Sequence, residues 1–140
     1  QFGRVDIPWR EFRRVTFGTA KEKLPAFNDF SNSKKIKGSV KTVDGNTFSG
    51  TIVYDLDEEF TMEVLQGKDD DIEYIIPFSK IQSISPKNYD YSNVKLTDGT
   101  SLTLGESQDV SDKNSGVLVF EGSKDPLYIP WEKIDSVNFN

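Results

Sequence analysis

Apolar and polar residues alternate along most of this chain with a period of two, which is the pattern of half-buried β-strands rather than of amphipathic helices. Residues 39–43 form one such strand and lead into an Asp-Gly-Asn turn at 44–46. Because Gly and Asn accept positive φ, this turn predicts a hairpin, with a second strand over 48–54.

Three more strands are predicted before residue 86. The third runs over 60–65, turns at 67–71 and pairs with a fourth over 72–78. Pro77 removes a donor from the ladder, so the fourth strand must end there or lie at an edge. Residues 79–81 leave room for one 3₁₀ turn, and 83–85 make a short fifth strand. The second half of the chain repeats these strands over 94–96, 101–104, 117–120, 127–131 and 136–139.

A motif of Ile-Pro, an aromatic residue and two spaced apolar residues occurs three times, beginning at Ile7, Ile76 and Ile129. The spacing Ile-Pro-aromatic-x-x-apolar-x-x-apolar is identical in all copies. A second pattern, Val-Lys followed by an Asp-Gly turn, begins at Val40 and Val94. Its distance to the next Ile-Pro pair agrees within one residue. The chain therefore contains an internal duplication.

The two patterns divide the chain into repeats. Two complete units cover 36–86 and 91–139, and 18–35 is predicted to be a linker. Residues 1–17 look like the tail of a preceding repeat, and we expect them to dock as a hairpin on one of the complete units. This tail resembles the second complete unit, because both share Ile-Pro-Trp and a closing Phe. The division predicts that the chain is the C-terminal part of a larger protein.

Five short strands with a one-turn helix before the last are the layout of a small SH3-like or Sm-like barrel. The resemblance rests on the Asp-Gly turn and the Ile-Pro-aromatic corner. The predicted fold class is all-β, with two tandem five-stranded barrels and the N-terminal hairpin. We expect the barrels to pack together, because one repeat alone buries too little apolar surface for comfortable stability.

Three segments point to a wider resemblance: Tyr54-Asp55-Leu56-Asp57-Glu58-Glu59, Gln108-Asp109-Val110 and Gly116-Val117-Leu118-Val119. With them, the paired units resemble uncharacterised bacterial proteins that repeat this barrel, often with an export signal upstream. The resemblance implies a periplasmic or extracellular location and no particular activity. The absence of cysteine is compatible with either side of a bacterial membrane.

Composition and charge exclude several classes of function. The 140 residues include no Cys and no His, which removes disulfides, Cys nucleophiles, thiolate zinc sites and His-dependent triads. Seventeen Lys and Arg against 23 Asp and Glu give a net charge of −6, which would repel nucleic acid and anionic membranes. No apolar run approaches the ~20 residues of a membrane helix. We therefore expect no nucleic-acid partner and no membrane insertion.

The acidic loops between the second and third strands of each unit are the first candidate site. Their oxygen ligands could bind Ca²⁺, although the spacing is not that of an EF-hand. Alternatively, the side chains bond neighbouring backbone N–H groups and shape the turns. The candidate ligands are Asp55, Asp57, Glu58, Asp109, Asp112 and Asn114.

Other charged groups have two readings each. The acids at 69–71 could recruit a cation or a basic partner, or form a solvated hairpin tip that discourages edge pairing. Arg10, Arg13 and Arg14, interleaved with Trp9 and Phe12, could contact nucleic acid or form a solvated face. The many carboxylates could support hydrolysis by a carboxyl pair, although nothing in the sequence places one of them in an apolar pocket.

Aromatic residues are the last candidates. Trp9, Phe78 and Trp131 each follow Ile-Pro, and exposed rings could grip a sugar or a proline-rich peptide. Packing in the core or between units is the favoured alternative. Tyr89 and Tyr91, in the short linker between the units, are candidates for binding a ligand or partner, or for filling the seam.

These observations favour a non-catalytic interaction or scaffold module of a larger bacterial protein. We expect no cofactor, and a partner that is another protein or the remainder of the parent chain. The first alternative is a Ca²⁺-binding module that uses the acidic loops. The second is a carboxylate-dependent hydrolase.

Overall fold

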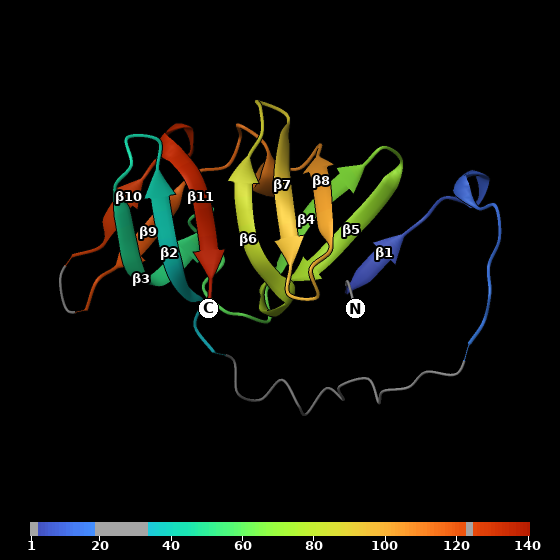
Figure 1. Ribbon diagram of the computed structural model, residues 1–140, viewed down its shortest axis with the longest axis horizontal. Coiled ribbons are helices and arrows are strands. Elements are labelled where there is room, and N and C mark those ends of the chain that lie inside the picture. The colour runs from blue at the N-terminus through green and yellow to red at the C-terminus, as the bar shows by residue number, and fades with distance from the viewer. Residues whose placement is uncertain (1–2, 19–33, 123–124) are drawn as a thin grey trace.

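The computed structural model describes residues 3–18, 34–122 and 125–140. In these segments the regular elements are β-strands and single-turn 3₁₀ helices, with no α-helix, so the predicted all-β class is confirmed. No helix in these segments is long and apolar enough to cross a membrane. All strands belong to one antiparallel sheet of eleven strands (Figure 1). They are β1 (Arg4–Asp6), β2 (Lys37–Thr42), β3 (Thr47–Tyr54), β4 (Val64–Asp69), β5 (Ile72–Pro77), β6 (Ile81–Pro86), β7 (Tyr91–Leu96), β8 (Ser101–Gly105), β9 (Val117–Phe120), β10 (Leu127–Ile129) and β11 (Ile134–Phe139).

The two Asp-Gly turns form the predicted hairpins, β2–β3 and β7–β8. Gly45 has φ +89° and Gly99 has φ +91°, a left-handed conformation that only glycine adopts at little cost. The Oδ1 atom of Asp98 accepts a hydrogen bond of 2.9 Å from the backbone N of Thr100, which holds the second turn. Each repeat therefore begins with a tight two-stranded hairpin.

Each Ile-Pro-aromatic motif forms the same corner. The prolines Pro8, Pro77 and Pro130 have φ of −58°, −59° and −67° and ψ of 144°, 138° and 150°. A three-residue 3₁₀ turn follows each: η1 (Trp9–Glu11), η3 (Phe78–Lys80) and η5 (Trp131–Lys133). The 3₁₀ turn predicted at 79–81 is therefore present, but it begins one residue earlier, at Phe78.

The strands of each repeat are divided between two groups in the sheet. The strand order is β1-β5-β4-β8-β7-β6-β11-β2-β3-β9-β10. One group contains the hairpin β7–β8 of the second repeat and the strands β4, β5 and β6 of the first. The other contains the hairpin β2–β3 of the first repeat and the strands β9, β10 and β11 of the second. Figure 1 shows the groups side by side, with β6 and β11 adjacent at the centre. The two repeats have exchanged their hairpins.

This arrangement differs from the predicted pair of barrels, in which the strands of 36–86 and those of 91–139 would pair among themselves. Instead, β3 pairs with β9 of the other repeat, β4 pairs with β8, and the sheet is not closed into a barrel. The physical reason lies in the segments 55–63 and 106–116 between the second and third strands of each repeat. These two crossovers are long enough to carry the chain from one group to the other.

One hydrophobic core extends through both groups. At its centre, the ring centroid of Tyr54 lies 5.3 Å from that of Phe78, 5.9 Å from that of Trp131 and 6.2 Å from that of Phe139. Two of these rings come from each repeat, and aromatic pairs at such spacings stabilise beyond the area they bury. Both corner aromatics in the complete repeats, Phe78 and Trp131, are buried, as the packing alternative predicts.

The third strand of the first repeat lies later in the sequence than predicted. We expected a strand over 60–65 and a turn from Gly67, but β4 continues to Asp69 and the turn is at Asp70 and Asp71. Glycine is needed at 67 for a packing reason, because a Cβ there would lie 2.9 Å from the Cβ of Leu104. The glycine that looked like a turn therefore allows close contact between β4 and β8.

The N-terminal segment contributes one strand rather than the predicted hairpin. β1 pairs with β5 antiparallel, with Val5 opposite Tyr74, and covers the edge of the sheet. No further strand is present in the described residues between Ile7 and Gly18. At the opposite edge, β10 follows Pro126, which has no N–H to donate and discourages further pairing.

We expect deletion of residues 1–17 to lower the melting temperature by about 2–4 °C, which is roughly 1 kcal/mol at this chain length. The effect is modest because β1 contributes three residue pairs to the sheet. The deletion also leaves β5 as an open edge, so we expect some self-association in size-exclusion chromatography. An unchanged melting curve, measured by circular dichroism, would show that β1 contributes no stability.

Candidate functional site

The acidic loops predicted as a site are the two crossovers, 55–63 and 106–116. Each crossover contains an aspartate whose carboxylate accepts a hydrogen bond from a backbone N–H outside that crossover. The Oδ2 atom of Asp109 accepts a hydrogen bond of 2.6 Å from the backbone N of Gln66, in β4. The Oδ1 atom of Asp55 accepts one from the backbone N of Ser115, in the other crossover. The hydroxyl of Tyr54 donates a bond of 2.6 Å to the carbonyl O of Asp109. Equivalent aspartates of the two repeats thus connect the exchanged segments.

Local geometry places Asp55 in this position. Asp55 and Leu56 have φ of +48° and +70°, an uncommon conformation for residues with a Cβ, and they turn the chain sharply after β3. The backbone N of Tyr54 donates to the carbonyl O of Glu58 at 2.9 Å, and the N of Glu58 donates back to the O of Tyr54 at 3.0 Å. This closed turn brings the buried Asp55 carboxylate to the second crossover.

Glu58 is the most perturbed acid of the cluster. Burial, the charge of Asp109 and the carboxyl of Asp57 raise the pKa of Glu58 to about 9. Its Oε2 atom is buried without a hydrogen-bond partner. Burial also raises the pKa of Asp109. At pH 7 Glu58 is therefore protonated, and the cluster carries less negative charge than its composition suggests.

The structure brings together only part of the predicted metal set. Asp55, Asp57 and Asp109 lie close enough to Glu58 to raise its pKa. Asn114 is buried, but its amide donates to the carbonyl O of Asp109 at 3.1 Å and accepts from the N of Gly116 at 2.9 Å. In the described part of the chain, no group of three or more acidic side chains is arranged to hold a metal ion.

The sixth predicted ligand, Asp112, lies apart on the surface. Its backbone N donates to the carbonyl O of Tyr89 at 2.7 Å, and its exposed side chain lines hollows beside the linker. Asn114 makes the local contact of the turn-shaping alternative, because it accepts from the backbone N of Gly116, whereas Asp55 and Asp109 accept from backbone N–H groups that are distant in sequence.

We expect no change in melting temperature between EDTA and millimolar Ca²⁺. The Asp55 and Asp109 oxygens already accept backbone hydrogen bonds, and Glu58 is neutral at pH 7. A ligand at a hundred times its Kd would add about 2.7 kcal/mol and raise the melting temperature by roughly 5–10 °C. Such a rise, abolished in an Asp109→Asn, Asp112→Asn double variant, would instead establish a cation site.

The two linker tyrosines line neighbouring hollows. Tyr89 is exposed and lines a hollow of about 490 Å³ together with Val43, Pro86 and Trp131. Tyr91 begins β7, is half-buried and lines a hollow of about 430 Å³, and Asp112 lines both hollows. Of the predicted pair, Tyr89 is the more exposed residue.

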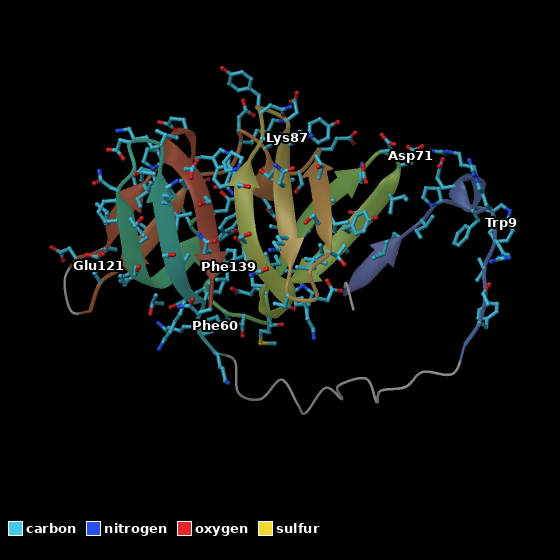
Figure 2. All side chains as sticks on the ribbon, viewed as in Figure 1. Trp9, Phe60, Asp71, Lys87, Glu121 and Phe139 are labelled. Carbon is cyan, nitrogen blue, oxygen red and sulfur yellow. The ribbon has the colours of Figure 1, made fainter. Side chains whose placement is uncertain are left out.

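The segment 7–17, which we call the arm, carries five of the eleven large hydrophobic side chains that are exposed in the described residues. Trp9 is 84% exposed and Phe17 94% exposed, and Ile7, Phe12 and Val15 are also exposed. The rings of Trp9 and Phe12 lie 5.5 Å apart, so the apolar side chains are grouped. Figure 2 shows Trp9 on the outer side of the arm, away from the sheet.

One ion pair ties the arm to the sheet. Arg10 pairs with Asp71, at the tip of the β4–β5 hairpin, and with Glu11 at 3.3 Å (Figure 2). The acidic tip is therefore a solvated turn that contacts a basic group of the same chain. Arg13 and Arg14 are exposed on the arm.

Sequence reasoning missed the exposure of Trp9, which was expected to pack in the core or between units. The motif itself carried no signal, because Trp9 and the buried Trp131 follow Ile-Pro at the same spacing. Comparisons of the chain with protein-family models, curated proteins and solved structures find no match.

Proposed function

We propose that this chain is a non-catalytic interaction module of a larger bacterial protein, and that the arm is its contact surface for a protein partner. The observation that carries the proposal is the exposure of Trp9 and its apolar neighbours on a segment anchored by β1. Grouped apolar side chains on a soluble surface typically mark an interaction site. Because no group of acidic side chains in the described residues is arranged to hold a metal ion, we favour this surface as the site.

The chemistry of the arm fits protein binding. Tryptophan and arginine are enriched among the residues that dominate binding energy at interfaces, and the arm combines Trp9 with Arg10, Arg13 and Arg14. Exposed rings next to arginines offer both apolar area and charge recognition. Burial of one large aromatic side chain contributes roughly 1.5–3 kcal/mol, so a few such contacts would support a specific complex.

A scaffold role is supported by the exchange of hairpins. We propose that each group of five strands is an open form of the small SH3-like or Sm-like barrel expected for one unit, with the fifth strand returning beside the first. The two repeats share the core and have exchanged hairpins, so they cannot separate without breaking the β3–β9 and β4–β8 pairings. The module would thus present the arm from one rigid body.

The test is retention of protein partners from an extract of the source cells on the immobilised chain. We expect a Trp9→Ala, Phe17→Ala double variant to lose most of the partner, since both side chains are exposed and their removal costs little stability. Tyr89→Ala is the matched control, because Tyr89 is a similarly exposed aromatic residue outside the arm. Loss in the control alone would move the contact surface to the linker, and equal retention by all variants would refute the proposal.

The hydrolase alternative is favoured by one observation, the raised pKa of Glu58 beside the ionisable Asp109. A carboxyl pair with separated pKa values is the arrangement of an acid and a nucleophile or base. However, hydrogen bonds from Gln66 to Asp109 and from Ser115 to Asp55 use these carboxylates to join the crossovers. The hollows described in this structure beside the linker, the arm and the β2–β3 turn are lined by other residues. We therefore assign Glu58 a structural role in the first crossover rather than a catalytic one.

A further inference from the structure

The arm has the backbone of two segments that are buried elsewhere in the same chain. Pro8 and the turn η1 repeat the conformation of Pro77 with η3 and of Pro130 with η5, and the residue after each turn is extended. In the repeat, Trp9 is therefore equivalent to Phe78 and Trp131. By the same spacing, Phe12 corresponds to Ile81 and Ile134, and Val15 to Ile84 and Val137.

The burial of these equivalent positions differs completely. Trp9 is 84% exposed, whereas Phe78 and Trp131 are 2% and 5% exposed. Val15 is 47% exposed, whereas its counterparts Ile84 and Val137 are fully buried. The arm therefore repeats the Ile-Pro-aromatic corner of the complete repeats without the strands that bury that corner there.

The complete repeats show what covers such a segment. Ile84 lies opposite Val94 of β7, and Val137 lies opposite Val40 of β2. In both cases the covering strand is the first strand of a hairpin from the other repeat. Both hairpins of this chain are already used, because β2 lies between β11 and β3, and β7 between β6 and β8. A third hairpin must therefore come from another repeat.

The charge of Arg13 on the arm indicates which residue the partner hairpin carries at the position of Lys41. In the covered second repeat, Lys41 of β2 pairs with Asp135 of β11, with 2.9 Å between Nζ and Oδ2. The arm has Arg13 at the position of Asp135. A hairpin with lysine at the Lys41 position would place two cations together, whereas an acidic residue there would pair with Arg13.

We propose that the arm binds a β-hairpin of the Val-Lys/Asp-Gly repeat type, supplied by a further repeat, with an acidic residue at the position of Lys41. Its first strand lies antiparallel to residues 12–17, as β2 lies along β11, with its counterpart of Val40 opposite Val15. The arm resembles the second repeat, whose last strand β11 is covered by the hairpin of the first repeat. The partner hairpin therefore resembles the hairpin of the first repeat. This inference rests on the proposed function and names the partner of the same surface.

The probe is a synthetic hairpin with the sequence of residues 37–51, closed by a disulfide between cysteines at its two ends. Lys37 and Thr51 face each other in the sheet, so the bridge holds the native register. One version keeps Lys41 and a second carries Lys41→Glu. Each is titrated into the isotopically labelled full chain, and the side-chain N–H signals of Trp9 and Trp131 are followed by NMR.

We expect the Lys41→Glu hairpin to shift the Trp9 signal and leave that of the buried Trp131 in place, and to bind about fivefold more tightly than the Lys41 version. In an Arg13→Glu chain this preference should reverse. A Phe12→Ser, Val15→Ser chain should abolish binding without a change in melting temperature, because both side chains are exposed. These three results together support the proposal.

Other results would overturn it. If neither hairpin moves the Trp9 signal while retention of a cellular partner still depends on the arm, the hairpin is not the partner and the proposed function stands. If neither hairpin moves the Trp9 signal and retention of a cellular partner does not depend on the arm either, the arm is not an interaction surface. If the Trp9 signal moves when the chain alone is concentrated, the arm binds a second copy instead of a further repeat.

Discussion

Replacing Tyr54 by alanine should lower the free energy of unfolding by about 3–5 kcal/mol, the usual cost of truncating a fully buried large aromatic side chain. Tyr54 is fully buried, and its ring contacts Phe78, Trp131 and Phe139. Because these rings come from both repeats, the cavity would weaken the contact between the two halves of the core. We expect the melting temperature to fall by about 10 °C or more in thermal denaturation followed by circular dichroism.

Tyr54→Phe separates the ring from the hydroxyl. The phenylalanine keeps the aromatic packing but leaves the carbonyl O of Asp109 without the bond of 2.6 Å from the Tyr54 hydroxyl. We expect this variant to lose about 1–2 kcal/mol, because Asn114 still donates to the same oxygen. If Tyr54→Phe were as unstable as Tyr54→Ala, the hydroxyl and not the ring would hold the crossovers together.

Local features of this fold follow from the sequence. The Asp-Gly turns give the hairpins because the glycines adopt positive φ, and the three Ile-Pro-aromatic motifs give the same corner because proline ends a strand. Each of these depends on neighbouring residues alone. The all-β class and the burial of Phe78 and Trp131 could therefore be predicted.

The exchange of hairpins could not be predicted in the same way. The two repeats have equivalent patterns, so the first strand of either hairpin can cover the fifth strand of either repeat. Val40 and Val94 are alike on the face that covers Val137 and Ile84. Alternation of apolar residues determines which face of a strand is buried, but not which copy supplies the neighbouring strand. That choice depends on the path of the crossovers.

The site was predictable only in part for the same reason. Asp55 and Asp109 stood out as equivalent acids, but their contacts are with Ser115 and Gln66, which are distant in sequence. Trp9 and Trp131 carry the same local motif, so no local pattern separates the exposed ring from the buried one. Residues whose environment is supplied by another repeat are thus the ones that sequence patterns misplace.

The stability of this chain should fall as the pH rises from 5 to 9, through Glu58. Its pKa is about 9 in the folded protein, against 4.5 for the ordinary side chain. Below pH 4.5 the carboxyl is protonated in both states and contributes no difference. As the pH rises, the unfolded chain releases this proton first, which favours unfolding until the folded pKa is passed. A fully desolvated group would lose about 6 kcal/mol over this range, and for the partly exposed Glu58 we expect about 2 kcal/mol.

Glu58→Gln isolates this contribution, since glutamine is neutral at every pH and nearly the same shape as protonated glutamate. We expect the variant to match the wild type near pH 4 and to be more stable by about 2 kcal/mol at pH 9, in urea denaturation at both values. Glu132→Gln, at an exposed glutamate in η5, is the control and should leave the pH dependence unchanged. Parallel pH profiles for Glu58→Gln and the wild type would mean that Glu58 is ionised at neutral pH. The crossover would then contain a solvated carboxylate, and the acids around it would again be available to a cation.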